Sequence, residues 1–152
     1  MLDGGEDIVV LDTRNDYETR VGTFDGAIGL DIPSFREFPD AIESLPDEYR
    51  SKTVVMYCTG GIRCEKASAV MLKAGFEDVR QLEGGILGYF EECGGTHWSG
   101  ECFVFDQRVA LDHQLEETEV VMCFKCREPL TVDEQESGHY VINQHCPYCF
   151  ND

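Results

Sequence analysis

The sequence predicts an α/β fold in which a parallel sheet is flanked by helices. Two short apolar runs rich in β-branched residues, 8–11 (IVVL) and 53–57 (TVVMY), have the composition of buried parallel strands. Segments with helical periodicity alternate with such strands, and this order builds parallel sheets. A chain of 152 residues is long enough for one domain with its own core and a small added module.

The first expected helix lies between these two strands and contains a proline. In residues 35–45, apolar side chains recur at spacings of three and four, which places them on one helical face. These side chains are Phe35, Phe38, Ile42 and Leu45. Because Pro39 lies inside the stretch and cannot donate to the helical hydrogen-bond ladder, we expect the helix to be kinked or split there.

The best-defined helix, residues 64–76, follows the second strand and ends near Gly75. Its apolar stripe consists of Ala67, Val70, Met71 and Ala74. A third strand at residues 78–82 and a helix at residues 86–93 come next, separated by Glu83-Gly84-Gly85. Because the carboxyl ends of parallel strands meet at one edge of the sheet, we expect this turn to form a wall of the pocket there.

The alternation of predicted strands and helices ends near Gly94. Residues 100–112 have the aromatic alternation of an extended segment, and an acidic stretch follows them. Residues 120–130 and 139–150 each carry a Cys-x-x-Cys pair, and each is expected to form a hairpin. We therefore expect a main domain at residues 1–112 and a small cysteine-rich module at residues 113–152.

Cys58 is the strongest candidate for a reactive residue. It follows the second strand and precedes the best-defined helix, the position where open α/β sheets bind ligands. Gly60 and Gly61 permit backbone N–H groups to converge on the sulfur, while Arg63 and the helix N-terminus add positive charge. The expected site loop consists of Cys58, Thr59, Gly60, Gly61, Ile62 and Arg63. These surroundings stabilise a thiolate for nucleophilic catalysis or for carrying a persulfide.

The size of this loop limits the size of the group that it can hold. Four residues separate Cys58 from Arg63, whereas the related cysteine phosphatases place five residues between cysteine and arginine to wrap a phosphate. The shorter loop favours a smaller group such as sulfur. An isolated cysteine at a strand end is more often a buried packing residue, but the glycines, the arginine and the following helix together favour a functional role.

Longer motifs carry a resemblance to a known family. DTRNDYE, CTGGIRCEK and LEGGI resemble a rhodanese domain in their order and spacing, over about residues 5–95. DTRNDYETRVGTFDGAI, CTGGIRCEKAS, QLEGGI and GECFVFDQRVALDH are similar, more narrowly, to the TrhO family of rhodanese-like tRNA uridine hydroxylases. The resemblance implies a rhodanese-like sheet flanked by helices. It also implies oxygen-dependent conversion of the wobble uridine of tRNA to 5-hydroxyuridine, with Cys58 in the essential cysteine position.

The resemblance also implies partners. Molecular oxygen would be the co-substrate and tRNA the substrate. Members of that family carry a further N-terminal domain, so we expect this chain to be a fragment of a longer protein whose tRNA binding requires that domain. The formal net charge of −18, from 12 basic and 30 acidic residues, argues against a general phosphate-backbone binder on this chain alone.

Three residues near the first strand are expected to support the site. Asp12, Arg14 and Glu18 match the family's Asp-x-Arg pattern and nearby acid, and we interpret them as an ion network that fixes the loops. Cys64 is either a structural cysteine or, as the resemblance suggests, a resolving thiol that captures an oxidised Cys58. The isolated residues with no assigned role beyond packing or ordinary hydrogen bonding are Cys93, Cys102, His97 and His113.

A second group of cysteines has the spacing of a metal site. Cys123-x-x-Cys126 and Cys146-x-x-Cys149 are separated by nineteen residues, and four thiolates so arranged predict a structural zinc ion in a zinc-ribbon-like tail. Iron in a rubredoxin-like site has the same ligands, and four incidental thiols are the remaining alternative. Because so short a segment cannot build its own core, the metal would supply its folding energy.

Three functions compete. The first is the rhodanese domain of a tRNA uridine hydroxylase, the second a sulfurtransferase with a persulfide on Cys58, and the third a non-catalytic zinc-containing adaptor. The residues identify no electron or sulfur donor. Because no apolar run is long enough for a bilayer and Met1 is not followed by a signal-peptide core, we expect a cytoplasmic protein without a membrane partner.

Overall fold

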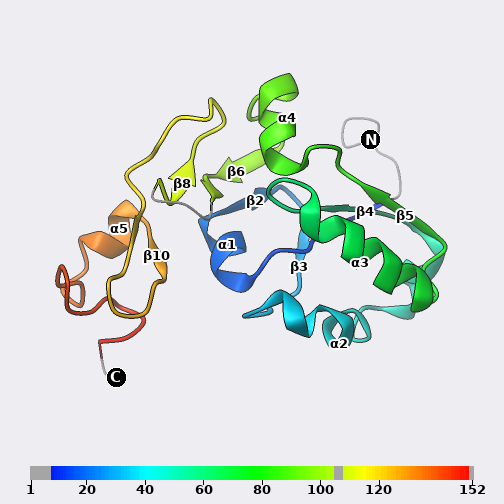
Figure 1. Ribbon diagram of the computed structural model, residues 1–152, viewed down its shortest axis with the longest axis horizontal. Coiled ribbons are helices and arrows are strands. Elements are labelled where there is room, and N and C mark those ends of the chain that lie inside the picture. Colours follow the sequence, from blue (N-terminus) through cyan, green and yellow to red (C-terminus); the bar gives the residue numbers. More distant parts are fainter. Residues whose placement is uncertain (1–7, 105–107, 151–152) are drawn as a thin grey trace.

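A four-stranded parallel sheet forms the centre of the molecule, in the strand order β3-β1-β4-β5 (Figure 1). The structure is a computed structural model that describes residues 8–104 and 108–150. The strands are β1 (Ile8–Asp12), β3 (Ile28–Gly29), β4 (Thr53–Tyr57) and β5 (Asp78–Gln81). Strands β1 and β4 are parallel over five residue pairs, from Ile8 opposite Thr53 to Asp12 opposite Tyr57. The prediction of an α/β fold with a parallel sheet is confirmed.

Helices pack on both faces of this sheet. On one face, α2 (Phe38–Ile42) and α3 (Ile62–Lys73) cover the strand residues that alternate inward. This core contains Val9, Leu11, Val54, Met56, Phe38, Ile42, Ala67 and Met71. On the other face, α4 (Gly85–Cys93) packs against Tyr57 and its neighbours. The alternation of strand side chains between the two faces therefore separates two hydrophobic clusters.

The proline-containing helix is split as predicted. A 3-10 turn, η1 (Phe35–Glu37), precedes α2, and Pro39 lies in the first turn of α2, where no N–H is needed. A second 3-10 turn, η2 (Asp47–Ser51), leads into β4. The helix predicted at residues 64–76 begins earlier, at Ile62, because the left-handed Gly61 already turns the chain into helical direction.

Several short elements were not predicted from the sequence. The helix α1 (Asp16–Val21) follows β1 directly, and β2 (Gly22–Phe24) pairs antiparallel with β6 (Trp98–Gly100). The edge strand β3 is also short. These segments lack the length that makes hydrophobic periodicity visible, so their conformation depends on the partners that they find in the fold.

The C-terminal part is built from short antiparallel pairs. Strand β7 (Cys102–Phe103) pairs with β8 (Ala110–Leu111), and β9 (Val121–Met122) forms a hairpin with β10 (Pro129–Leu130). The hairpin expected at residues 120–130 is confirmed. The hairpin expected at residues 139–150 is wrong, because its residues form turns with a single bridge, Val141 to His145. Turn conformation lets the second Cys-x-x-Cys fold towards the first.

The C-terminal segment packs against α1. The short helix α5 (Val132–Gln135) follows β10, and α1 lies between this segment and the start of α3 in Figure 1. Arg20 at the end of α1 makes an ion pair with Glu128 at 2.8 Å and donates to the carbonyl of Pro129. Within residues 8–104 and 108–150, no helix is long and apolar enough to cross a membrane.

Candidate active site

Cys58 lies just after β4, at the carboxyl edge of the sheet, with its side chain buried. Gly61 adopts the left-handed conformation with a φ of 97°, which only glycine adopts without strain, and its N–H lies 3.0 Å from the Cys58 sulfur. Gly60 has open space beside it. Of the two glycines in the expected loop, Gly61 is therefore the one that the turn requires.

The environment of Cys58 favours its thiolate. The Gly61 N–H donates a hydrogen bond to the Cys58 sulfur at 3.0 Å, and the thiol and N–H of Cys64 and the N–H of Arg63 also favour its charged form. Although burial opposes the charged form, these donors lower the pKa of Cys58 to about 5. The neighbouring Cys58, together with burial, raises the pKa of Cys64. The pair therefore holds one thiolate at neutral pH, on Cys58.

The charge of Arg63 is balanced by a buried carboxylate. Its guanidinium makes a two-point ion pair with Glu18, with Nη1–Oε2 at 2.6 Å and Nη2–Oε1 at 2.8 Å. The Thr59 hydroxyl accepts a further hydrogen bond from Arg63 at 3.3 Å. Glu18 belongs to α1, so this pair fixes the active-site loop to α1.

The second ion pair, between Asp12 and Arg14, is fully buried. Arg14 donates from Nε at 2.9 Å and from Nη2 at 2.7 Å to the Asp12 carboxylate. The Tyr57 hydroxyl donates to the same carboxylate at 2.8 Å. Burial disfavours the charged form of Arg14, but the attraction and hydrogen bonds of Asp12 raise its pKa, so the guanidinium remains charged. This network fixes the residue immediately before Cys58.

Three supporting residues were not expected to act on the Cys58 loop. Thr13 donates its N–H and its hydroxyl to the Tyr57 carbonyl, at 3.1 and 2.8 Å. At the start of α4, the N–H groups of Ile86 and Leu87 donate to the carbonyls of Cys58 and Thr59. In the sequence, Thr13 could have been found because it lies inside the Asp-x-Arg pattern, whereas Ile86 and Leu87 belong to no such pattern.

The expected pocket wall at Glu83-Gly84-Gly85 contacts the loop through its last residue. A Cβ on Gly85 would lie 2.6 Å from the Cys58 carbonyl oxygen and 2.5 Å from that of Thr59, and the φ of Gly85 is +64°. Glycine at this position therefore permits α4 to pack directly behind the active-site loop.

The remaining isolated residues are distributed around the site. Cys102 is buried, as expected for a packing residue, and burial raises its pKa to about 12. Cys93 is exposed at the end of α4, so its expected packing role is wrong. His97 adopts a left-handed conformation, and its carbonyl accepts from the N–H of Asp25 at 2.8 Å. His113 lies against Gly95.

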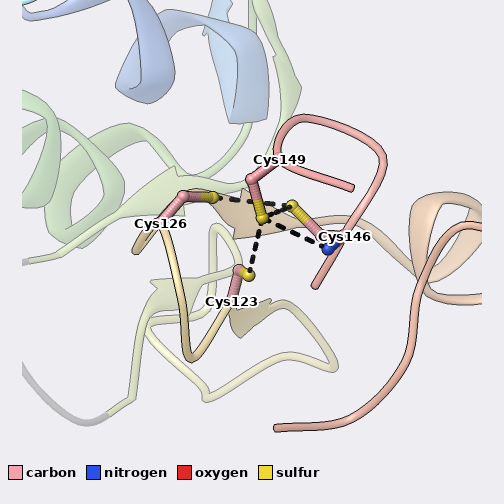
Figure 2. A group of neighbouring side chains, drawn as sticks. All are labelled: Cys123, Cys126, Cys146 and Cys149. Carbon is pink, nitrogen blue, oxygen red and sulfur yellow. Dashed lines mark hydrogen bonds between the residues drawn. The ribbon is translucent and has the colours of Figure 1, made fainter. Parts of the chain in front are cut away.

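The four C-terminal cysteines converge on one point (Figure 2). The sulfur atoms of Cys126 and Cys146 are 3.5 Å apart, and those of Cys123 and Cys146 lie 3.8 Å from the sulfur of Cys149. Four thiolates at about 2.3 Å from a tetrahedral ion lie about 3.8 Å from one another. The donor set and its spacing therefore fit a metal ion held by four sulfurs.

The low pKa of Cys58 gives a directly measurable result. We expect iodoacetamide to label Cys58 with a rate that rises through about pH 5 and is constant above it, because only the thiolate reacts. The exposed Cys93 serves as the control thiol and is labelled in the same samples. Mass spectrometry of peptides quenched at each pH gives both rates. Parallel pH profiles for the two cysteines would contradict an activated thiolate.

Comparisons with known proteins place the chain in a family and identify similar proteins. The profile of the Rhodanese-like domain family matches residues 1–92. Proteins named tRNA uridine(34) hydroxylase from Cupriavidus taiwanensis and Burkholderia ambifaria are 54% and 53% identical over 147 residues, 97% of the chain. The chain spans about half the length of these relatives, 52% of each. The solved rhodanese-like domain of an Anabaena protein is 24% identical, with a TM-score of 0.51 over 65% of this chain and 70% of that one.

Proposed function

Because the chain belongs to the rhodanese-like domain family, we propose that it is the rhodanese part of a tRNA uridine(34) hydroxylase, with Cys58 as its catalytic residue. The observation that carries the proposal is the buried Cys58 sulfur, which accepts a hydrogen bond from the Gly61 N–H and whose surroundings lower its pKa to about 5. An adaptor that only binds a partner needs no such cradle. The support for tRNA as substrate, and for a cytoplasmic location, is the name that the relatives share.

The thiolate suits the chemistry of uracil. Carbon C6 of the base is electrophilic because it is conjugated with the C4 carbonyl, so the Cys58 sulfur can add there and make C5 nucleophilic. Oxygenation at C5, loss of the C5 proton and departure of the sulfur then give 5-hydroxyuridine. The balanced reaction consumes uridine, molecular oxygen, two electrons and two protons, and releases water. In this proposal an external reductant supplies the two electrons.

Cys64 has a second role in this proposal. If hydrogen peroxide, the two-electron reduction product of oxygen, converts the Cys58 thiolate and a proton to a sulfenic acid and water, the adjacent Cys64 thiol condenses with that sulfenic acid, which forms a disulfide and releases a second water. Two electrons from a reductant restore both thiols. Support for this role is that both sulfurs are buried in one hydrophobic cluster, where Cys58 raises the pKa of Cys64. Cys64 would then protect Cys58 from irreversible oxidation.

The test of the function is nucleoside mass spectrometry of tRNA from cells in which the gene for this chain is deleted. We expect 5-hydroxyuridine derivatives at the wobble position to disappear, while 2-thiouridine derivatives remain unchanged. Re-expression of the gene in the same cells is the control and restores the modification. Unchanged 5-hydroxyuridine would contradict the hydroxylase.

Sulfur transfer remains the second candidate, and one observation favours it. The backbone N–H groups that stabilise the Cys58 thiolate would also stabilise a terminal persulfide on the same sulfur. The nucleoside analysis separates the two functions, because a sulfurtransferase for tRNA predicts loss of the 2-thio group with 5-hydroxyuridine retained.

For the C-terminal segment, we propose that residues 113–152 form a module held by a structural zinc ion. The ligands are Cys123, Cys126, Cys146 and Cys149, and four thiolates leave no open position for catalysis. The module is also anchored outside itself, because Val120 belongs to a hydrophobic cluster with Val109 and Val21. The zinc would hold the turns together, and the cluster would attach them to α1.

Loss of one ligand should release this module locally. We expect Cys146→Ser to lower the zinc content and to make residues 113–152 sensitive to trypsin, because three thiolates cannot complete the tetrahedral site. The sheet and its helices should survive the same digestion. Elemental analysis and mapped proteolysis measure both effects, with the exposed Cys93→Ser as the matched control. Protein purified without chelator that holds iron, or no metal, would contradict zinc.

A further inference from the structure

A recess of about 380 Å³ separates α1 from the first Cys-x-x-Cys turn. Asp16, Tyr17 and Pro33 line it on the side of the sheet. On the opposite side, the lining residues come from the cysteine-rich segment and include Met122, Arg127 and Glu128. The recess therefore lies between two parts of the chain that are more than 80 residues apart in sequence.

The recess is linked to the active-site loop through α1. Glu18 on this helix holds Arg63 of the loop, and the neighbouring Tyr17 lies close enough to Arg63 to interact with its charge. On its other side, α1 contacts the cysteine-rich segment through Arg20 and Glu128. Figure 1 shows this short helix, α1, between the start of α3 and the C-terminal segment that carries β10 and α5.

The cysteine turn concentrates positive charge in a strongly acidic chain. Lys125 and Arg127 are the two basic residues of residues 113–152, and both lie on this one turn. Arg127 is exposed where it borders the recess. On the same turn, the ring of Phe124 is 70% exposed. Exposed aromatic and cationic side chains on one turn are typical of contacts to single-stranded nucleic acid.

The charges in the recess limit what it can hold. Arg127 can pair with one phosphate, whereas Asp16 and Glu128 would repel a second. Because Glu128 is already paired with Arg20, Asp16 is the carboxylate that can instead accept hydrogen bonds from the N–H groups of a base or from ribose hydroxyls. The half-buried ring of Tyr17 offers an apolar surface for a base. This combination fits one nucleotide and does not fit the backbone of a duplex.

We propose that this recess binds a nucleotide that flanks the target uridine of a single-stranded RNA loop, with Arg127 on its phosphate and Tyr17 against its base. The inference rests on the proposed hydroxylase function, because that function brings an RNA loop to Cys58. Arg127 and Tyr17 are here positioning residues for substrate. The cysteine-rich module then acts as one wall of the substrate channel, in addition to being stabilised by a metal.

Photocrosslinking tests the position of the RNA. The probe is a synthetic RNA hairpin whose loop carries 4-thiouridine beside the target uridine, mixed with the zinc-loaded protein expressed from the intact gene. We expect mapped crosslinks at Tyr17 or within residues 123–128. Crosslinks confined to other surfaces, or no crosslink, overturn the proposal. Failure of the hydroxylase itself is a separate result, because it appears as unchanged 5-hydroxyuridine in tRNA from the deletion strain.

Two substitutions test the contacts. We expect Arg127→Gln to weaken RNA binding about tenfold and to lower the salt dependence of log affinity by about 0.7. Arg80→Gln, on the exposed side of β5, is the matched control and should leave both unchanged. Tyr17→Leu should weaken binding about fivefold or more, whereas Tyr17→Phe keeps the ring and should restore it. Unchanged affinity in Arg127→Gln, or affinity lost together with zinc, overturns the proposal.

Discussion

Replacing Cys58 by serine is expected to abolish 5-hydroxyuridine formation in cells. The serine hydroxyl has nearly the size of the thiol, but it is a far weaker acid, so the same N–H donors yield no nucleophile at neutral pH. The variant gene is expressed in the deletion strain, and tRNA nucleosides are measured by mass spectrometry. We expect the Cys58→Ser strain to be indistinguishable from the deletion strain.

The control for this experiment is Cys93→Ser, which removes an exposed thiol at the end of α4. It should restore wild-type levels of 5-hydroxyuridine. Immunoblotting confirms that both variants accumulate equally, which separates chemistry from protein loss. Full modification with Cys58→Ser would show that the thiolate takes no part in the reaction.

The substitution Asp12→Asn is expected to lower the free energy of unfolding by about 3–5 kcal/mol, because it leaves the buried guanidinium of Arg14 without a counter-charge. Both side chains of this pair have no exposed surface. The Tyr57 hydroxyl would also exchange a carboxylate acceptor for a weaker amide. Urea denaturation followed by circular dichroism measures the change.

A surface pair gives the matched control. Asp47 pairs with Arg50 at 2.8 Å, but the Asp47 side chain is fully exposed, so Asp47→Asn should leave the urea midpoint unchanged. If Asp12→Asn also left the urea midpoint unchanged, the buried network would not contribute to stability. Because Tyr57 directly precedes Cys58, we also expect Asp12→Asn to slow the alkylation of Cys58 at pH 6.

The central strands and helices that were predicted correctly share one property, which is a continuous or periodic apolar pattern. Residues 53–57 form β4 with the predicted bounds, and Pro39 divides the helical stretch as expected. Short elements were missed or wrong. The second Cys-x-x-Cys, expected in a hairpin, lies in turns because the convergence of sulfurs requires a compact loop.

For the candidate site, the residue types and spacing in the sequence identified Cys58, its loop and the four-cysteine cluster. They also identified the charged residues of the site, but they did not show which of these residues form ion pairs with one another. The sequence predicted that Arg63 acts on Cys58, whereas in the fold its guanidinium pairs with Glu18. Choice of partner depends on which side chains the packed elements bring within hydrogen-bond distance, and local sequence contains no such distances.

The amino-acid sequence determines the chemistry that this protein can perform, because thiols, glycines and charged groups are properties of single residues and short spacings. The tertiary structure decides which of those groups act together. The Thr13 hydroxyl comes within hydrogen-bond distance of the Cys64 sulfur, and Gly85 lets α4 support the loop. Most distantly, Arg127 comes to face Tyr17 across a recess. Such contacts join residues far apart in the chain, and they exist only once the core has fixed the relative positions of the elements.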